Sequence, residues 1–227
     1  MFDNVFDIFD KGSWTMYVLF PLSIYVTAII LLKIYQFAAY GAGNVAFVPK
    51  LLQFLEDGNI TGAHNLLLNE NGPVAKTAFA TLSAIYEMRL PPEMVKEEVV
   101  RAGSFELRIF ESYLKILELA ANIAPLLGLL GTVSGMVKAF AKLELAGARV
   151  DPSLLAGGIW EALLATVAGL SIAIPAMAAH YIFEGKVDRI RADMKDVAVR
   201  IILLAEAGST EEKKEKIKKP NIHSVSW

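Results

Sequence analysis

The stretch PSLLAGGIWEALLATVAGLSIAIPAMAAHY, Pro152 to Tyr181, is apolar and long enough to cross a lipid bilayer, yet it contains Glu161 and Thr166. A charged residue at the centre of a membrane helix costs roughly 2.5 to 3.5 kcal/mol on insertion scales. Such a residue is usually retained because it has a polar partner, a water-filled cavity or a function. The stretch therefore predicts a membrane helix with a functional polar site.

The composition of the whole chain is that of a membrane protein. Of its 227 residues, 55% are hydrophobic and 20% are charged, and the mean hydropathy is +0.45. These values are too apolar for an ordinary soluble domain of this length. The net charge of -2 and the dispersed basic residues argue against a nucleic-acid partner. With no cysteine and three scattered histidines, a disulfide framework, a thiolate zinc site and a histidine metal cluster are excluded.

Two further apolar stretches precede the first one quoted. Trp14 to Leu32 has no charged residue, and Leu114 to Phe140 is apolar except for a few polar positions. The acidic N-terminus lacks a cleavage signal, so we expect the first span to be retained. A short link joins the second and third spans, which predicts an antiparallel helix pair. Asp151 suits the N-cap of the third helix and Pro152 its first position.

The segment between the first two spans has the composition of a soluble helical region. Turn signals at Gly58-Asn59, Asn71-Gly72-Pro73 and Pro91-Pro92 divide it. Four helices are predicted, at roughly 47–56, 60–68, 74–88 and from 92 onward. We expect the last of them to continue unbroken into the second span. The third span should likewise continue into solvent, because apolar residues keep a helical spacing beyond Tyr181.

The predicted fold is an all-α integral membrane protein with three transmembrane helices and long cytoplasmic helical extensions. Basic residues near the span ends gather on the side of the central segment and the C-terminus, which predicts an N-terminus outside and a C-terminus inside. The expected parts are a periplasmic segment (1–13), a first transmembrane helix (14–40), a cytoplasmic helical region (41–113), a second transmembrane helix (114–140), a short periplasmic loop (141–152), a third transmembrane helix (153–181), a cytoplasmic helical extension (182–207) and a disordered tail (208–227).

The second span carries a polar stripe and the third a stripe of small residues. Positions 118, 122, 125, 129, 132 and 136 share one helical face, which places Glu118, Asn122 and Thr132 together. In the third span the stripe consists of Ile159, Ala162, Thr166, Gly169, Ala173 and Ala176. A single helix pair cannot hide both stripes from lipid, so we expect the chain to self-associate around a central axis.

These stripes support two interpretations. In one, Thr132, Thr166 and Glu161 border a hydrated ion path, and Glu161 exchanges a proton when water reaches it. In the other, both threonines bond to carbonyl groups one turn earlier and Glu161 lies near the outer interface. The glycines assigned to helix packing are Gly128, Gly131, Gly135 and Gly169.

Three classes of function can be compared with these features: an enzyme, a passive scaffold and an ion-conducting subunit. The sequence has no H-E-x-x-H, G-x-S-x-G or G-x-x-x-x-G-K-[ST] motif and no paired membrane aspartates, so we expect neither an enzyme nor a cofactor. A passive helical scaffold would not need a carboxylate and two threonines at mid-membrane. An ion-conducting subunit is therefore favoured over the scaffold.

Two segments carry a resemblance to a known family. APLLGLLGTVSGMVKAF (124–140) and GGIWEALLATVAGLSIAIPA (157–176) closely resemble the paired signature helices of the MotA/TolQ/ExbB family, in its ExbB and TolQ branch. The segment GNITGAHNLLLNENGPVAKTAF is similar too, and the resemblance extends to about residue 207. Three spans, rather than the four of flagellar stators, argue against MotA proper. The opening GSWTMYVLFPLSIYVTAIILLKIYQF looks more like ExbB than TolQ.

The resemblance implies a multi-pass subunit of the bacterial inner membrane. It implies a pentamer around the single transmembrane helices of two copies of an ExbD- or TolR-like partner, which supplies a proton-carrying aspartate. By motif position, Thr132, Thr166 and Glu161 would face the pore. Proton flow, favoured over sodium, would drive a TonB-like protein that energises outer-membrane import. The alternative is a TolQ-like subunit that acts on a TolA-like protein in the Tol-Pal envelope-maintenance system.

Overall fold

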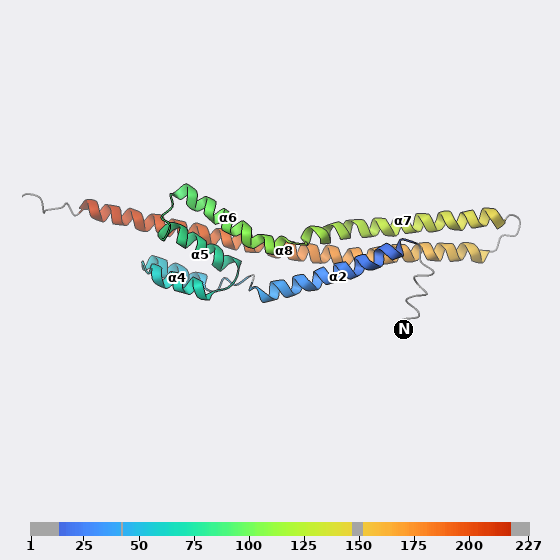
Figure 1. The fold of residues 1–227 in the computed structure, drawn as a ribbon, viewed down its shortest axis with the longest axis horizontal. Helices are drawn as coiled ribbons and strands as arrows, with labels where there is room; N and C mark the ends of the chain where they lie inside the picture. The colour runs from blue at the N-terminus through green and yellow to red at the C-terminus, as the bar shows by residue number, and fades with distance from the viewer. Residues whose placement is uncertain (1–13, 42, 147–151, 219–227) are drawn as a thin grey trace, which may run out of the picture. The chain divides into compact units, whose positions relative to one another are not determined.

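The structure is a computed structural model that describes residues 14–41, 43–146 and 152–218. These residues form helices joined by turns, and the described ranges contain no strand. The helices, labelled in Figure 1, are α2 (Met16–Ala39), α3 (Val48–Glu56), α4 (Ile60–Asn69), α5 (Pro73–Tyr86), α6 (Pro92–Glu111), α7 (Leu114–Ala146) and α8 (Pro152–Lys218). The expected all-α fold is confirmed.

The chain divides into two compact units. The first unit comprises the described residues of Met1–Tyr35 and Glu111–Gly185, and the second comprises those of Gln36–Phe110 and Lys186–Trp227. Helix α8 contributes its first part to the first unit and the rest to the second.

In the first unit, α2 packs on the pair formed by α7 and α8 (Figure 1). Leu19 of α2 forms a buried cluster with Ala124 of α7 and Ala173 of α8. Alanine side chains fill little space, so the two long helices approach closely and α2 supplies the larger side chain. The core of this unit is therefore built mainly from small residues.

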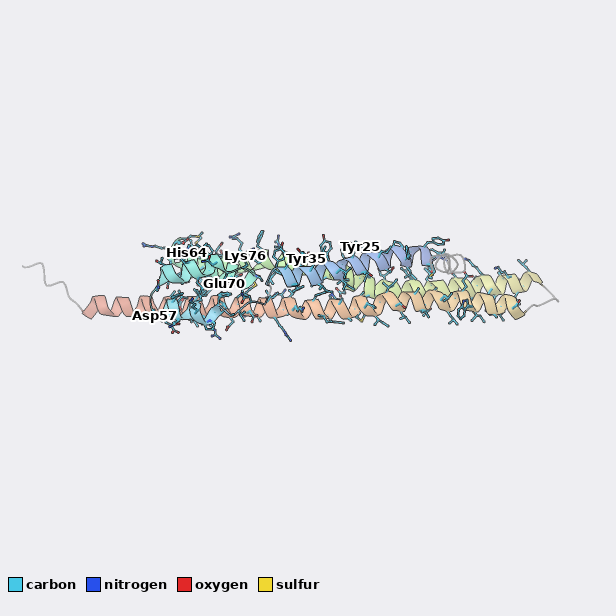
Figure 2. All side chains as sticks on the ribbon, turned by 90° about the horizontal axis from the view of Figure 1, so that it is seen from below. Tyr25, Tyr35, Asp57, His64, Glu70 and Lys76 are labelled. Carbon is cyan, nitrogen blue, oxygen red and sulfur yellow. The ribbon has the colours of Figure 1, made fainter. Side chains whose placement is uncertain are left out.

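Three helices are long and apolar enough to cross a membrane. They lie in Met16–Ala39, Pro92–Leu145 and Leu155–Gly208. Only 22%, 33% and 39% of the residues in their most apolar windows are buried. Apolar side chains are therefore left on the surface, as expected where lipid is the solvent. Tyr25 and Tyr35, both exposed on α2, are labelled in Figure 2. The chain is an integral membrane protein, as its composition predicts.

The second unit contains α3 to α6 with the end of α2 and the last part of α8. The expected turn at Gly58-Asn59 precedes α4, where the Asn59 side chain accepts a hydrogen bond from the backbone N–H of Gly62 at 2.8 Å. This interaction caps the helix. Gly72 has φ +118°, which a residue with a Cβ rarely adopts, and Pro73 then begins α5. Buried apolar residues recur along α8 at helical spacing: Val187, Ile190, Met194, Val197 and Ile201.

Two contacts between charged or polar side chains join neighbouring parts of the second unit. The Lys76 ammonium on α5 lies 3.1 Å from a carboxylate oxygen of Glu106 on α6, and Glu106 is mostly buried. His64 Nε2 on α4 lies 3.2 Å from Glu87 just after α5. Figure 2 labels Lys76 and His64, together with Asp57 and Glu70.

Helix α6 does not continue into α7, contrary to the expectation of one unbroken helix. The chain turns at Ser112 and Tyr113, and Tyr113 has φ +65°. This left-handed conformation ends a helix, although glycine usually provides it. The side-chain amide of Gln36 donates to the carbonyl oxygen of Ile109 at 2.8 Å, which satisfies an acceptor left free in the last turn of α6.

Helix α8 extends through Lys218, ten residues beyond the expected start of a disordered tail at 208. The sequence STEEKKEKIK (209–218) is rich in glutamate and lysine, which are good helix formers. The remaining residues of the expected tail, 219–227, lie outside the described residues, as do those of the expected segment 1–13.

Candidate functional site

Helices α7 and α8 meet along a line of small residues. A Cβ atom placed on Gly128 would lie 2.9 Å from the carbonyl oxygen of Ala165. One placed on Gly169 would lie 2.5 Å from the carbonyl oxygen of Ala124. Real Cβ atoms essentially never approach another heavy atom within 3.0 Å. The two backbones are therefore at a separation that requires glycine at both positions.

Two more glycines extend the contact along α7. A Cβ atom on Gly131 would collide with the Cβ of Ala165 and would lie 2.5 Å from Thr15 Oγ1. One on Gly135 would lie 3.1 Å from the Cβ of Ala162. The structure thus places all four glycines singled out in the sequence on the α7–α8 contact.

Thr166 lies at the edge of this contact. Its hydroxyl donates across the helix pair to the carbonyl oxygen of Gly128, with an Oγ1–O distance of 3.4 Å. The side chain is half-buried. The simple alternative, a bond to a carbonyl one turn earlier in α8, is not what the structure has. The Thr166 hydroxyl instead links α8 to α7.

Thr132 does make the local bond. Its hydroxyl donates to the carbonyl oxygen of Leu129 in the preceding turn of α7, at 2.7 Å. Such a bond satisfies the donor and leaves both lone pairs of the oxygen available to a further donor. The side chain is half-buried, so this oxygen lies at a surface of the unit.

Glu161 is a half-buried carboxylate within the apolar part of α8. It precedes Ala162, which packs against Gly135 of α7. Among the described residues it has neither a hydrogen bond nor an ion pair. An ionised carboxylate in a membrane needs water, a cation or a hydrogen-bond donor. The described residues of a single chain supply neither a cation nor a hydrogen-bond donor to Glu161.

The polar stripe of α7 is also uncovered. Glu118 and Asn122 are exposed, and neither has a hydrogen bond or ion pair within the described ranges. Leu129 on the same stripe is exposed, whereas Pro125 is half-buried. The buried face of α7 lies beside this stripe and is formed by Ala121, Ala124, Gly128, Gly131 and Gly135. One face of α7 therefore contacts α8 while the polar face stays open.

Sequence reasoning missed two buried polar residues, one just before α2 and one within it. Thr15 is fully buried, and its hydroxyl has no hydrogen-bond partner among the described residues. Lys33 on α2 is fully buried, and its ammonium donates to Ser112 Oγ at 3.4 Å. The spacing could have revealed Lys33, because it falls on the helical face that also buries Val26 and Ile29.

His180 links α8 to the start of α7. Its Nδ1 lies 3.2 Å from the carbonyl oxygen of Leu114, and its Nε2 lies 3.5 Å from a carboxylate oxygen of Glu184. No group of three or more metal-ligating side chains occurs in the part of the chain that the structure describes.

Comparisons with known proteins point to one family. Residues 69–196 match the model of the MotA/TolQ/ExbB proton channel family. The chain is 31% identical over 174 residues to the biopolymer transport protein ExbB of Pseudomonas putida, which covers 71% of this chain and 49% of that protein. It is 40% identical over 86 residues to the biopolymer transport protein exbB1 of Vibrio cholerae, covering 38% of each.

A TolQ protein is similar as well. The chain is 36% identical over 107 residues to the Tol-Pal system protein TolQ of Haemophilus influenzae, which covers 45% of this chain and 46% of that protein. The matched part of the chain spans half or less of the length of these three relatives.

Proposed function

Because the chain belongs to the MotA/TolQ/ExbB proton channel family, we propose that it is the channel subunit of an ExbB–ExbD-type motor in a bacterial inner membrane. In this proposal, proton flow through an assembly of several copies drives a TonB-like protein that spans the periplasm. The result is energised import across the outer membrane.

The main support is the uncovered polar surface on two membrane helices. Glu118, Asn122 and Thr132 lie along one face of α7, and Glu161 lies on α8 without a partner among the described residues. Exposure of these groups to lipid would cost several kcal/mol, since a central membrane carboxylate alone costs roughly 2.5 to 3.5 kcal/mol. Self-association around a hydrated axis removes that cost.

Each site residue has a proposed role. Thr132 and Thr166 present hydroxyl groups that order water or accept a hydrogen bond from a proton-carrying group. Glu161 binds and releases a proton as its hydration changes. Gly128, Gly131, Gly135 and Gly169 hold α7 and α8 together, so that the polar groups of both helices keep a fixed separation.

The proposed assembly is a homo-pentamer around two copies of an ExbD- or TolR-like single-span partner, which supplies the proton-carrying carboxylate. The N-terminus lies in the periplasm and the C-terminus in the cytoplasm, because basic residues gather at one end of the spans. The chain itself has no proposed catalytic activity and needs no cofactor.

A TolQ-like role is the second candidate, because TolQ of Haemophilus influenzae is among the similar proteins. The subunit would then act on a TolA-like protein in envelope maintenance. Complementation separates the two candidates. An ExbB-like chain restores energised import to a strain without ExbB, whereas a TolQ-like chain restores envelope integrity to a strain without TolQ.

The proposal is tested first by native mass spectrometry of the purified protein, with and without a co-expressed single-span partner. A ring of several subunits that retains the partner supports it. A monomer or dimer that does not bind the partner would contradict the proposal. Glu161 would then have only a local structural role, as in a passive scaffold.

Proton flux then tests the site. In proteoliposomes that contain the assembled complex, Glu161→Gln should lower proton flux by at least about tenfold, since loss of a positioned proton-transfer group costs this much or more. The matched control is Glu144→Gln, which neutralises an exposed carboxylate near the end of α7. Equal flux in the two variants would show that Glu161 does not carry protons.

A further inference from the structure

A small hollow in the second unit lies where α2 and the apolar part of α8 end. It has a volume of about 370 Å³ and is lined by Phe37, Gly43, Lys186, Arg189, Ile190 and Asp193. This volume is within the usual range for small-ligand sites, about 300 to 1,000 Å³. A Cβ atom placed on Gly43 would meet nothing within 4 Å, so this side of the hollow is open.

The hollow is located at the membrane boundary. Phe37 lies in the last turn of α2, which is long and apolar enough to cross a bilayer. Lys186 and Arg189 follow Tyr181 by five and eight residues on α8, or roughly 8 and 12 Å along a helix. The headgroup region occupies roughly 5 to 8 Å on each side of the hydrocarbon core. Lys186 is therefore level with the headgroup region, and the long side chain of Arg189 can extend back toward it.

The two cations that line the hollow differ from their neighbours on α8. The Lys186 ammonium lies over the ring of Phe37, 5.5 Å from its centroid. Within the described ranges, no carboxylate lies within 4.0 Å of Lys186 or Arg189. By contrast, Arg191 pairs with Asp188, and Arg200 pairs with Asp196 at 2.9 Å. The charges of Lys186 and Arg189 are therefore not paired with a carboxylate of the described residues, whereas those of Arg191 and Arg200 are.

We propose that this hollow binds the headgroup of an anionic phospholipid, with its phosphate between Lys186 and Arg189. An arginine guanidinium matches the geometry of a phosphate, and a lysine held over an aromatic ring adds a fixed point charge. Two cations and the Asp193 carboxylate give the lining a net positive charge, which favours a headgroup of net negative charge. Asp193 can accept hydrogen bonds from headgroup hydroxyls such as those of phosphatidylglycerol. The acyl chains would follow the exposed apolar surface of α2.

The test is lipid retention by the full-length protein, measured by native mass spectrometry after titration with phosphatidylglycerol. The variant Lys186→Gln with Arg189→Gln should bind this lipid roughly 30-fold more weakly, the effect expected of two cations near a membrane surface. The matched control is Arg191→Gln with Arg200→Gln, which removes the same charge from the same helix at positions already paired. Its affinity should stay within about twofold of the parent protein, because surface ion pairs contribute little.

Three outcomes would overturn the inference. The first is equal weakening in the hollow variant and the control, which would reduce the effect to the overall charge of α8. The second is equal retention of phosphatidylcholine, which is neutral and lacks a headgroup hydroxyl. The third is binding of soluble glycerol 1-phosphate as tightly as phosphatidylglycerol, which would indicate a site for a free phosphate.

A charge-preserving variant shows whether weaker binding results from lost charge or from misfolding. Lys186→Arg with Arg189→Lys keeps both cations and should retain phosphatidylglycerol to within a fewfold of the parent protein. Loss of the lipid in this variant, with an unchanged helical circular dichroism spectrum, would contradict a site that recognises charge at these two positions. Because the readout is lipid binding alone, the result does not depend on whether the protein conducts protons.

Discussion

At the scale of single residues, Thr15 carries a buried hydroxyl without a partner among the described residues, directed at Gly131. An unsatisfied buried hydroxyl costs about 1 to 3 kcal/mol, whereas an apolar group of the same shape does not. Thr15→Val should therefore raise the free energy of unfolding by about 1 kcal/mol, measured by denaturant titration in detergent.

A threonine within α2 serves as the control. Thr27 donates to the carbonyl oxygen of Ser23 in the preceding turn and is exposed. Thr27→Val should change stability by less than about 0.5 kcal/mol. If Thr15→Val were instead the more destabilising of the two, the hydroxyl of Thr15 would have a hydrogen-bond partner in the protein.

Glu98 offers a test at one titratable group outside the spans. The Arg101 guanidinium donates to its carboxylate, and this hydrogen bond holds the pKa of Glu98 below its usual value of 4.5. The resulting stabilisation of α6 is present above pH 4.5 and is lost as the pH falls through the lowered pKa. In Arg101→Gln, NMR titration of Glu98 should show its pKa returning toward 4.5. An unchanged pKa would mean that the pair is not formed in solution.

At the scale of helices, the α7–α8 contact predicts opposite effects of one substitution at two glycines of α8. Gly169→Ala puts a Cβ atom 2.5 Å from a main-chain oxygen and should destabilise the protein by about 1 to 3 kcal/mol. Gly157 has open space around its Cβ position. Gly157→Ala should be neutral or stabilise by up to about 1 kcal/mol, because alanine favours the helix. Thermal unfolding in detergent measures both, and equal effects would contradict the close contact.

The turn between α6 and α7 can be tested in the same way. Tyr113 has φ +65°, a conformation that glycine adopts without strain. Tyr113→Gly should therefore be neutral or stabilise the protein by up to about 1 kcal/mol. Tyr113→Ile should destabilise by at least about 1 kcal/mol, because a β-branched residue is strongly disfavoured there. If both variants lost stability equally, the side chain rather than the backbone would matter at this position.

The helices themselves were largely predictable from the sequence. The breaks at Gly58, Gly72 and Pro92 carry strong local signals, and the apolar spans are long. The turn at Tyr113 was not predictable, because no proline or glycine marks it. Tertiary contacts, such as the bond from Gln36 to Ile109, favour it instead. The onset of the apolar run at Leu114 coincides with the first residue of α7.

At the scale of the whole molecule, the proposed ion path predicts that function and assembly separate. Within the described residues, Thr132 bonds only to Leu129 in the preceding turn of α7, so Thr132→Val should leave folding and native mass unchanged. It should lower proton flux by at least about tenfold if the hydroxyl contacts the proton path. Ser171→Ala removes a similar local bond, to Val167, and should leave the flux unchanged. Equal loss of assembly in both variants would favour the scaffold instead.

The candidate site was predictable only in part. The sequence identified the glycines that the structure places between α7 and α8, because small residues at helical spacing have few other uses in a membrane. It could not tell that Thr166 bonds across the pair to Gly128 while Thr132 bonds within its own helix. That choice depends on the distance between two backbones, which only the packed structure defines. The burial of Thr15 could not be predicted, because no pattern in the neighbouring sequence indicates it.

The identity of the atom opposite each glycine also limits how this protein can recover from mutation. Gly128 and Gly169 face main-chain oxygens, which no second substitution can remove. Gly131 and Gly158 face the Cβ atoms of Ala165 and Ala139, which an alanine-to-glycine change would delete. A genetic screen for intragenic suppressors should therefore rescue Gly158→Ala through Ala139→Gly, whereas Gly169→Ala should have no equivalent rescue at Ala124.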